Sequence, residues 1–140
     1  MANEIAAMFA YGTLKRGEER EKLWPARPLT VVTAFTQGRL YELGEYPGLV
    51  RGEDRVQGEL WIFKHRDIQR VLEVLDEVED YPRLYLREPF DCETFDGQAI
   101  SATAYICAQT DPLTEEMRIL PDEQGIVNWK PAGGRFQSIL

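Results

Sequence analysis

The sequence predicts an α+β domain in which a mixed or antiparallel sheet, able to curl into a small barrel, packs against one main helix. Two observations favour this fold class. Five segments have the length and apolar content of strands, and one stretch, residues 67–81, carries apolar residues at helical spacing. Chains with several strands and one clear helix form α+β domains. The 140 residues match one domain, residues 1–140, and suffice to bury a core without metal or disulfide.

The predicted strands are separated by recognisable turns. In chain order they are residues 5–11, 29–43, 56–63, 84–93 and 99–108. Gly38 interrupts the second strand, which is typical of a β-bulge. Asp96 and Gly97 predict a hairpin turn between the last two strands. The stretch GEYPGLVRGED, residues 44–54, contains three glycines and a proline, which predicts an irregular loop.

The charge and hydropathy of the chain argue against two classes of partner. The formal net charge is -8 and the pI is about 4.7, which opposes binding to the phosphate backbone of nucleic acid. No segment approaches the roughly 20 apolar residues that span a bilayer, and the N-terminus lacks the features of a secretion signal. We therefore expect a cytoplasmic protein with no nucleic-acid and no membrane partner. The sequence carries no signal for an oligomeric state.

A single histidine, His65, limits the possible chemistry. It lies in the polar stretch FKHRDIQR, where the helix is expected to begin, and we interpret it as solvated. Serine or cysteine nucleophiles that depend on a histidine are therefore disfavoured. No spacing resembles a zinc site and no Gly-rich phosphate loop occurs, so we expect no metal and no cofactor. Cys92 and Cys107 could face each other if their strands pair, but in a protein that is not secreted we interpret them as reduced core residues.

The predicted helix, DIQRVLEVLDEVEDY, places one acid on its apolar face. It begins with Asp67 as the N-cap and ends before Pro82. At about 100° per residue, Glu79 falls about 20° from Ile68, inside the stripe of leucines and valines. The other acids of the helix fall on the solvated face: Glu73, Asp76, Glu77 and Asp80.

Two interpretations of Glu79 are open from this geometry. A carboxylate on an apolar face is costly unless it is hydrogen-bonded, paired or neutral. In the first interpretation, Glu79 lies in a frayed last turn, where its side chain reaches water. In the second, the helix delivers a partly desolvated acid into a cavity, and the pKa of Glu79 rises toward neutrality as a general base requires.

Four motifs together carry a resemblance to a known family. In order along the chain they are FAYGTLKRG, GRLYELGEYPGLV, VQGELWIF and LDEVEDYPRLYLREPF. They closely resemble the gamma-glutamylcyclotransferase-like family, from about residue 8 to about residue 108. The resemblance implies a small mixed, barrel-like sheet with short additional helices at its edge. It also implies a cavity whose mouth holds the loop of residues 11–14.

The same resemblance implies an activity. Family members of known activity release 5-oxoproline from a gamma-glutamyl amine, amino acid or peptide, and the acid that aligns with Glu79 serves as the base. The substrate's own α-amine attacks its γ-carbonyl, closes a five-membered lactam and expels the amine. A carboxylate with a raised pKa can take the proton of the attacking amine and return it to the leaving nitrogen. No metal or cofactor is required, which agrees with the scarcity of histidine.

The loop of residues 11–14 follows the first predicted strand and is expected to bind an anion. Gly12 lets the backbone turn, so that the amides of Gly12, Thr13 and Leu14 can converge on one point. The anion is either the α-carboxylate of the substrate or the oxyanion formed during attack. The alternative is a plain turn in which Thr13 bonds its own backbone. Lys15 and Arg16 are interpreted as solvated surface.

Further substrate-binding candidates come from the family motifs and from one predicted strand. Tyr11, Tyr46 and Gly48 match motifs of the family. Tyr85 shares one face of the strand after the helix with Arg87 and could bond Glu79 or the substrate. Tyr41 matches as well, but aromatic packing explains it equally. Arg87 could bond Glu79 or the substrate, or pair with a surface acid. An arginine beside Glu79 would lower its pKa, so Tyr85 is the favoured neighbour.

Two other functions compete with the cyclotransferase. A catalytically silent member of the same fold would bind a small acid or amide as a sensor or partner module, but a purely binding pocket would not need Glu79. A carboxylate-pair hydrolase such as a glycosidase would need a second acid about 5 to 10 Å away. Glu59 and Glu88 are formal candidates for that acid, although no pattern singles them out.

Overall fold

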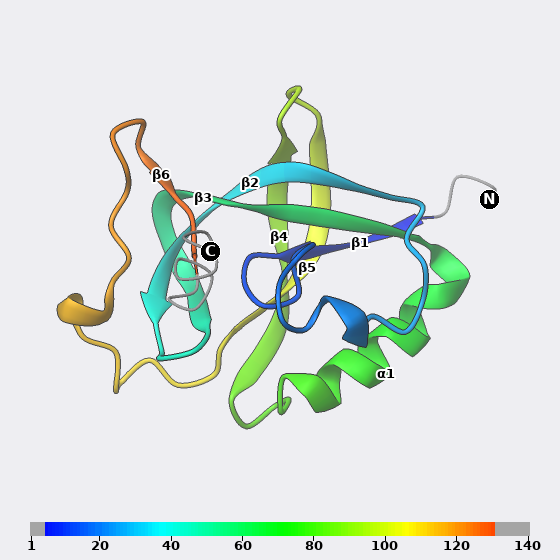
Figure 1. The fold of residues 1–140 in the computed structure, drawn as a ribbon, viewed down its shortest axis with the longest axis horizontal. Coiled ribbons are helices and arrows are strands. Elements are labelled where there is room, and N and C mark those ends of the chain that lie inside the picture. Colours follow the sequence, from blue (N-terminus) through cyan, green and yellow to red (C-terminus); the bar gives the residue numbers. More distant parts are fainter. Residues whose placement is uncertain (1–4, 131–140) are drawn as a thin grey trace, which may run out of the picture.

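The computed structural model describes residues 5–130 and shows strands wound around a common interior, with one helix on the outside (Figure 1). The strands are β1 (Ile5–Ala10), β2 (Thr30–Glu42), β3 (Pro47–Lys64), β4 (Tyr85–Thr94), β5 (Ala99–Cys107) and β6 (Ile126–Val127). The helix α1 spans Ile68–Val78. Short 3-10 turns occupy Glu21–Leu23 (η1), His65–Asp67 (η2) and Glu115–Met117 (η3).

The strands β1 to β5 close into a barrel of mixed direction. Their order is β1-β5-β4-β2-β3, and β1 also pairs with β3, which completes the ring. Neighbours in the ring are antiparallel except β1 and β5, which run parallel beside Met8 and Thr103. The short β6 adds to β3 in parallel. The predicted fold class, an α+β barrel-like sheet with one main helix, is confirmed.

Residues 44–54 belong largely to a hairpin, so the expectation of an irregular loop is wrong. β3 already begins at Pro47 and pairs with β2 up to the connection. Its glycines allow close approach of neighbouring atoms: a Cβ at Gly52 would lie 2.9 Å from the Cβ of Arg39. The predicted bulge in β2 is confirmed by a register shift between Gly38 and Arg39.

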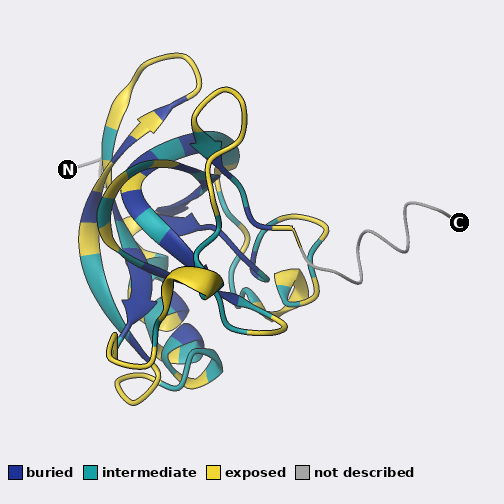
Figure 2. Cartoon of the chain, turned by 90° about the vertical axis from the view of Figure 1, so that its left-hand side faces the viewer, coloured by how far each residue is buried: buried dark blue, intermediate teal, exposed yellow. Residues whose placement is uncertain are grey.

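Two clusters of buried side chains divide the core, and β1 contributes to both because its side chains alternate in direction. Phe9 belongs to the cluster inside the barrel, whereas Met8 belongs to the cluster between the barrel wall and α1. Figure 2 shows where the buried residues lie along the strands. Val71 and Leu75 of α1 have no exposed area. Burial of one such side chain stabilises the fold by about 1.5–3 kcal/mol, so this packing fixes α1 against the barrel.

The helix α1 is shorter than predicted because of a motif at its C-terminal end. Asp80 adopts a φ of 54°, and its amide donates to the carbonyl of Glu77 at 3.2 Å. The amide of Tyr81 donates to the carbonyl of Asp76 at 2.9 Å. These two bonds form a Schellman motif, in which glycine usually occupies the left-handed position. Glu79 is therefore the C-cap residue and not part of the last turn.

Several smaller expectations can be compared with the structure. Asp67 occupies the N-cap of α1, but its side chain makes no capping hydrogen bond. His65 is exposed in η2, as predicted. Cys92 and Cys107 are buried and carry free thiols, which confirms the interpretation as reduced core residues. Among residues 5–130, no helix is both long enough and apolar enough to cross a membrane.

Candidate active site

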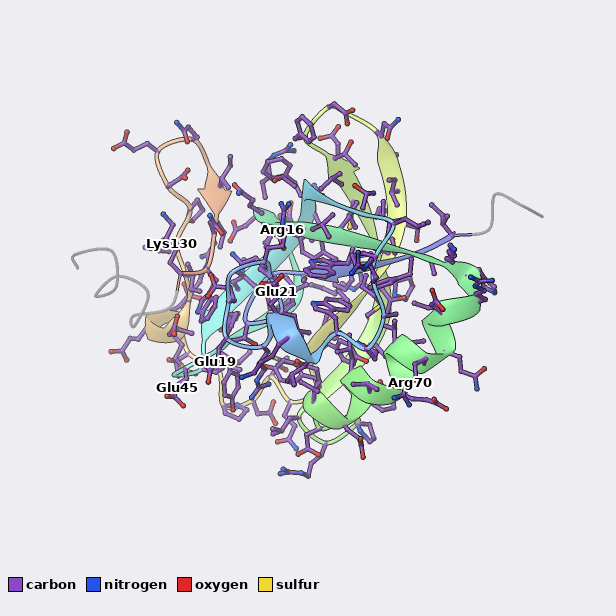
Figure 3. The ribbon with its side chains drawn as sticks, turned by 45° about the vertical axis from the view of Figure 1, so that its right-hand side comes forward. Arg16, Glu19, Glu21, Glu45, Arg70 and Lys130 are labelled. Atoms are coloured by element: carbon purple, nitrogen blue, oxygen red, sulfur yellow. The ribbon has the colours of Figure 1, made fainter. Side chains whose placement is uncertain are left out.

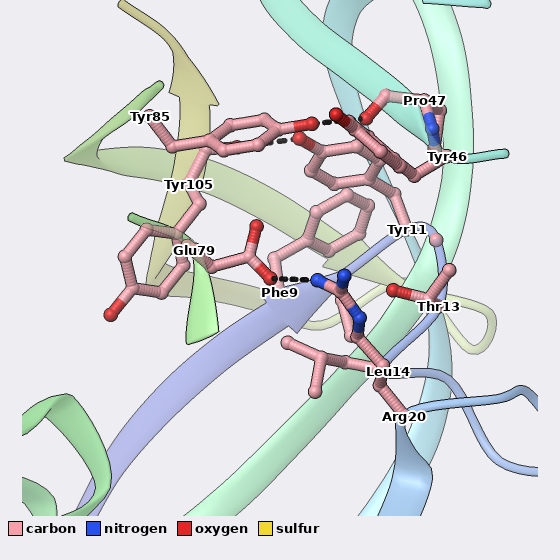
Figure 4. Close-up of a pocket in the computed structure, with 12 residues that line it drawn as sticks. Phe9, Tyr11, Thr13, Leu14, Arg20, Tyr46, Pro47, Glu79, Tyr85 and Tyr105 are labelled. Carbon is pink, nitrogen blue, oxygen red and sulfur yellow. Dashed lines mark hydrogen bonds and ion pairs between the residues drawn. The ribbon is translucent and has the colours of Figure 1, made fainter. Parts of the chain in front are cut away.

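A pocket opens where the end of β1, the C-terminal end of α1, the β2–β3 connection and strands β4 and β5 meet (Figure 4). Its empty space measures about 410 Å³, including the part of the mouth that is open to solvent. The residues that line it are Phe9, Ala10, Tyr11, Gly12, Thr13, Leu14, Arg20, Tyr46, Pro47, Glu79, Tyr85 and Tyr105.

Glu79 holds its carboxylate inside this pocket, at the end of α1. Its side chain is only 11% exposed, and within the described residues the carboxylate accepts no hydrogen bond. Burial raises the pKa of Glu79 from its ordinary value of 4.5 to about 7, and the Arg20 guanidinium lowers it by a smaller amount. The partial negative charge at a helix C-terminus also disfavours an anion there. The structure thus supports the interpretation of a desolvated acid and not that of a frayed turn.

Arg20 lies opposite Glu79 at the mouth of the pocket (Figure 4). Its Nη1 atom is 3.9 Å from Oε1 of Glu79, which is an ion pair too long for a hydrogen bond. Its Cζ atom lies 6.0 Å from the centre of the Tyr46 ring, at the outer limit of a cation–π contact. The Arg20 amide donates to the carbonyl of Thr13 at 2.8 Å, which ties this residue to the loop after β1.

The buried tyrosine hydroxyls around the pocket are committed to protein acceptors. Tyr11 donates to the carbonyl of Tyr105 at 2.7 Å and accepts from the amide of Leu49 at 3.2 Å. Tyr85 donates to the carbonyl of Pro47 at 2.9 Å. Burial raises the pKa of Tyr11 and of Tyr85 above the ordinary tyrosine value. Both therefore stay neutral and shape the wall, which leaves Glu79 as the lining acid that titrates near neutral pH.

The loop after β1 lines the pocket, and its carbonyls are hydrogen-bonded within the protein. The carbonyl of Thr13 accepts from the amide of Arg20, that of Gly12 from the amide of Lys15, and that of Leu14 from the indole of Trp24. Among the described residues, no protein acceptor is found for the amides of Thr13 and Leu14. Successive backbone amides without a protein acceptor can bind an anion where they point to one place. A Cβ at Gly12 would lie 2.8 Å from the Pro47 ring, so a larger residue would displace the pocket wall.

A second acid, Asp76, lies one turn before Glu79 and has a different environment. Arg87 donates to its two oxygens at 2.8 and 3.0 Å, and the Tyr105 hydroxyl donates at 2.7 Å. Partial burial raises the pKa of Asp76, but these bonds lower it by more, so the carboxyl titrates below its usual range. Arg87 thus pairs with Asp76 and not with Glu79.

Comparison with known proteins identifies the family. Residues 8–127 match the family model described as gamma-glutamyl cyclotransferase, AIG2-like. The chain belongs to this family. Because the match covers most of the sequence, the resemblance seen in the four motifs is confirmed, and the protein is a gamma-glutamylcyclotransferase-like enzyme by family.

Individual relatives agree with this family. A protein of Vibrio cholerae, provisionally named gamma-glutamylcyclotransferase, is 35% identical over 85 residues, which cover 60% of this chain and 70% of the relative. The crystal structure of a mouse AIG2-like protein aligns with a TM-score of 0.63 at 24% identity, over 93% of this chain and 99% of that one. A structure of a gamma-glutamyl cyclotransferase aligns with a TM-score of 0.55 at 17% identity, over 74% and 67%. At these identities the two structures show a shared fold.

Most of the residues predicted for a cyclotransferase site come together around the pocket. Glu79, Tyr46, Tyr85 and the loop of residues 11–14 all line it. Gly48 does not. A Cβ at Gly48 would lie 2.2 Å from the Sγ atom of Cys107, so this glycine is required for packing beside the pocket. The roles predicted for these side chains remain predictions.

Sequence analysis missed Arg20 and misjudged Lys15. Arg20 lies in the charged stretch after the loop, outside any periodic segment, and the sequence offers no signal that separates it from its neighbours. Lys15 was expected at the surface, but its ammonium donates to Oδ1 of Asn128 and to the carbonyl of Trp129, at 3.3 and 3.2 Å. Burial lowers the pKa of Lys15. Arg16 is exposed as expected, and within residues 5–130 no group of three or more potential ligand side chains could hold a metal ion.

Proposed function

We propose that this protein releases 5-oxoproline from a gamma-glutamyl amine, amino acid or peptide, with Glu79 as the general acid and base and without a metal. The observation that supports this proposal is the buried Glu79 carboxylate in the pocket, whose pKa of about 7 suits proton transfer at neutral pH. Membership of the gamma-glutamyl cyclotransferase, AIG2-like family supports the reaction class.

The reaction is an internal aminolysis. The α-amine nitrogen of the substrate attacks its γ-carbonyl carbon and forms the lactam bond, while Glu79 accepts a proton from that nitrogen. The tetrahedral intermediate then collapses, the bond to the leaving amine breaks, and Glu79 returns the proton to the departing nitrogen. The products are 5-oxoproline and the free amine, and no water is consumed.

The pocket would assist by holding the substrate in a bent conformation. The amine and the γ-carbonyl belong to one molecule, so the rate depends on bringing them together, and such orientation can contribute several kcal/mol, up to about 10. The tyrosine walls are fixed by hydrogen bonds to strands β3 and β5, which favours a preformed shape.

The test is 5-oxoproline release, measured by mass spectrometry, from a panel of gamma-glutamyl amines, amino acids and dipeptides. We expect release by the natural protein and a loss of about 10²- to 10⁴-fold in Glu79→Gln. Glu77→Gln is the matched control, because Glu77 is an exposed acid on the same helix. Equal release by Glu79→Gln would show that Glu79 is not the base. Absence of release from the whole panel, together with a ligand-induced thermal shift, would instead support the catalytically silent binder.

A further inference from the structure

Arg20 is the charged partner that the sequence did not reveal, and its surroundings are unusual among the arginines of this chain. Of the described residues that line the pocket, it alone carries a positive charge. Its backbone is held by the bond to Thr13, and the carbonyl of Arg20 accepts from the amide of Leu23 at 2.9 Å. The guanidinium therefore projects into the mouth from a fixed backbone position (Figure 4).

The guanidinium of Arg20 keeps its donors available. Arg16, Arg87 and Arg118 each donate hydrogen bonds to carboxylates at 3.2 Å or less. Arg20 makes no hydrogen bond through its side chain among the described residues, and its contact with Glu79 spans 3.9 Å. With 36% of its side chain exposed, it can still turn toward a ligand at the mouth. A guanidinium offers five N–H donors in a fork that matches a carboxylate.

The spacing of Arg20 and Glu79 matches the α-amino acid end of a gamma-glutamyl compound. The amine and the carboxylate carbon of that end are bonded to the same carbon, so they lie about 2.5 Å apart. The proposed reaction places the amine beside Glu79. The carboxylate must then lie within a few ångströms of Glu79, which is where the Arg20 guanidinium is found.

We propose that Arg20 binds the α-carboxylate of the gamma-glutamyl substrate and that the amides of Thr13 and Leu14 bind the oxygen of the reacting γ-carbonyl. This inference rests on the proposed cyclotransferase function. It assigns the two anionic groups of the reaction to two different partners: the permanent anion to a cation, and the developing oxyanion to fixed amide dipoles. Arg20 is then a substrate-binding residue that orients the amine toward Glu79.

Binding of the α-carboxylate by Arg20 would also keep the pKa of Glu79 high. An unpaired Arg20 lowers the pKa of Glu79, whereas a guanidinium neutralised by a substrate carboxylate does so less. A substrate without the α-carboxylate would not form the ion pair with Arg20, and Arg20 would then continue to lower the pKa of Glu79.

The test uses two substrates that share one leaving amine. The first is a gamma-glutamyl amide, and the second is the corresponding 4-aminobutanoyl amide, which lacks the α-carboxylate and closes to 2-pyrrolidinone. We expect Arg20→Gln to lower kcat/KM for the first substrate by about 10- to 100-fold, as loss of a charge-assisted bidentate contact does, and to leave the second within about threefold. For the first substrate, the kcat/KM of Arg20→Lys should lie between those of the natural protein and of Arg20→Gln, because lysine keeps the positive charge but lacks the bidentate donors of a guanidinium. Arg70→Gln is the control, because Arg70 is exposed on α1 away from the pocket (Figure 3).

An equal loss for both substrates in Arg20→Gln would overturn the inference and would mean that Arg20 acts on Glu79 or on the fold. Failure of the proposed function would look different, since the natural protein would then release neither lactam. Calorimetric binding of 5-oxoproline and of 2-pyrrolidinone decides the Arg20 assignment in that case. Weaker binding of 5-oxoproline alone in Arg20→Gln would support it, whereas unchanged binding, or no binding to either form, would overturn it.

Discussion

Asp76 and Glu79 lie at the same end of α1, and both are at least partly buried, yet their pKa values shift in opposite directions. Asp76 faces β4 and β5, where Arg87 and Tyr105 donate three hydrogen bonds to its carboxylate. Glu79 faces the pocket, where its nearest cation is 3.9 Å away. The comparison teaches that burial alone does not set the charge of an acid. What matters is whether the protein supplies donors to replace the lost water.

The different environments of Asp76 and Glu79 also give the two carboxylates different properties. Asp76 joins the helix to the sheet and stays ionised over the physiological range, so it has no proton to exchange. Glu79 is left without donors within the described residues, which costs stability but brings its pKa to about 7. Removing each acid in turn should therefore have opposite effects on the stability of the fold.

The largest effect on stability is expected from Glu79→Gln at alkaline pH. Because the pKa of Glu79 is higher in the folded state than in the unfolded state, ionisation destabilises the fold as pH rises from about 4.5 through 7. The shift corresponds to up to about 3 kcal/mol at pH 8. Urea unfolding should show Glu79→Gln to be more stable than the natural protein at pH 8, and the two should converge near pH 4.5. A variant that is less stable at both pH values would contradict this account of Glu79.

The next effect is on the dependence of the rate on pH. If an ionised Glu79 is the base, kcat/KM should rise with pH and level off above about 7. Between pH 8 and pH 5 the initial rate of 5-oxoproline release should fall by about 100-fold, because only a small fraction of Glu79 is ionised at pH 5. Asp76→Asn should keep the same profile. A midpoint between pH 4 and 5 would mean that Glu79 behaves as an ordinary solvated carboxyl.

The smallest effect is expected from Asp76→Asn, and its sign is reversed. The pKa of Asp76 is lower in the folded state, so its ionised form stabilises the fold above the ordinary aspartate pKa, and this contribution is lost as pH falls through the folded value. Replacing the carboxylate should lower the free energy of unfolding by about 1–2 kcal/mol at pH 7. Urea titrations should show a larger difference at pH 7 than at pH 3, and Glu77→Gln should show none at either pH.

The barrel was predictable because the apolar residues of each strand form a pattern that is visible in the sequence. The apolar character of residues 5–11 and 99–108 arises from burial on the two sides of each strand, and the observed β1 and β5 differ from these ranges by one residue. The segment 44–54 was mistaken for a loop because three glycines usually mark turns. Here Gly48 and Gly52 lie in β3, where a contact distant in sequence leaves no room for a Cβ. Local pattern does not record such contacts.

The acid of the site, Glu79, was predictable from the sequence, whereas its cation, Arg20, was not. Glu79 broke the apolar pattern of a helix, which gave a visible anomaly. Arg20 lies in a stretch where every neighbour is also polar, and it meets Glu79 through tertiary structure alone. The end of the helix was misplaced because Asp80 adopts the left-handed conformation that glycine usually adopts where a helix ends. With aspartate at this position, the helix end carries no such signal in the sequence.

The Tyr11 hydroxyl has a consequence for motion. Tyr11 directly follows β1, and its hydroxyl donates to the carbonyl of Tyr105 in β5 and accepts from the amide of Leu49 in β3. The Tyr11 side chain therefore lines the pocket and also links two strands of the barrel, so we expect the pocket to widen little while these hydrogen bonds are intact. We expect the Leu49 amide to exchange with deuterium as slowly as the central strands do. A substrate would then enter a cavity of fixed width, and differences in size among leaving amines would be accommodated at the open mouth.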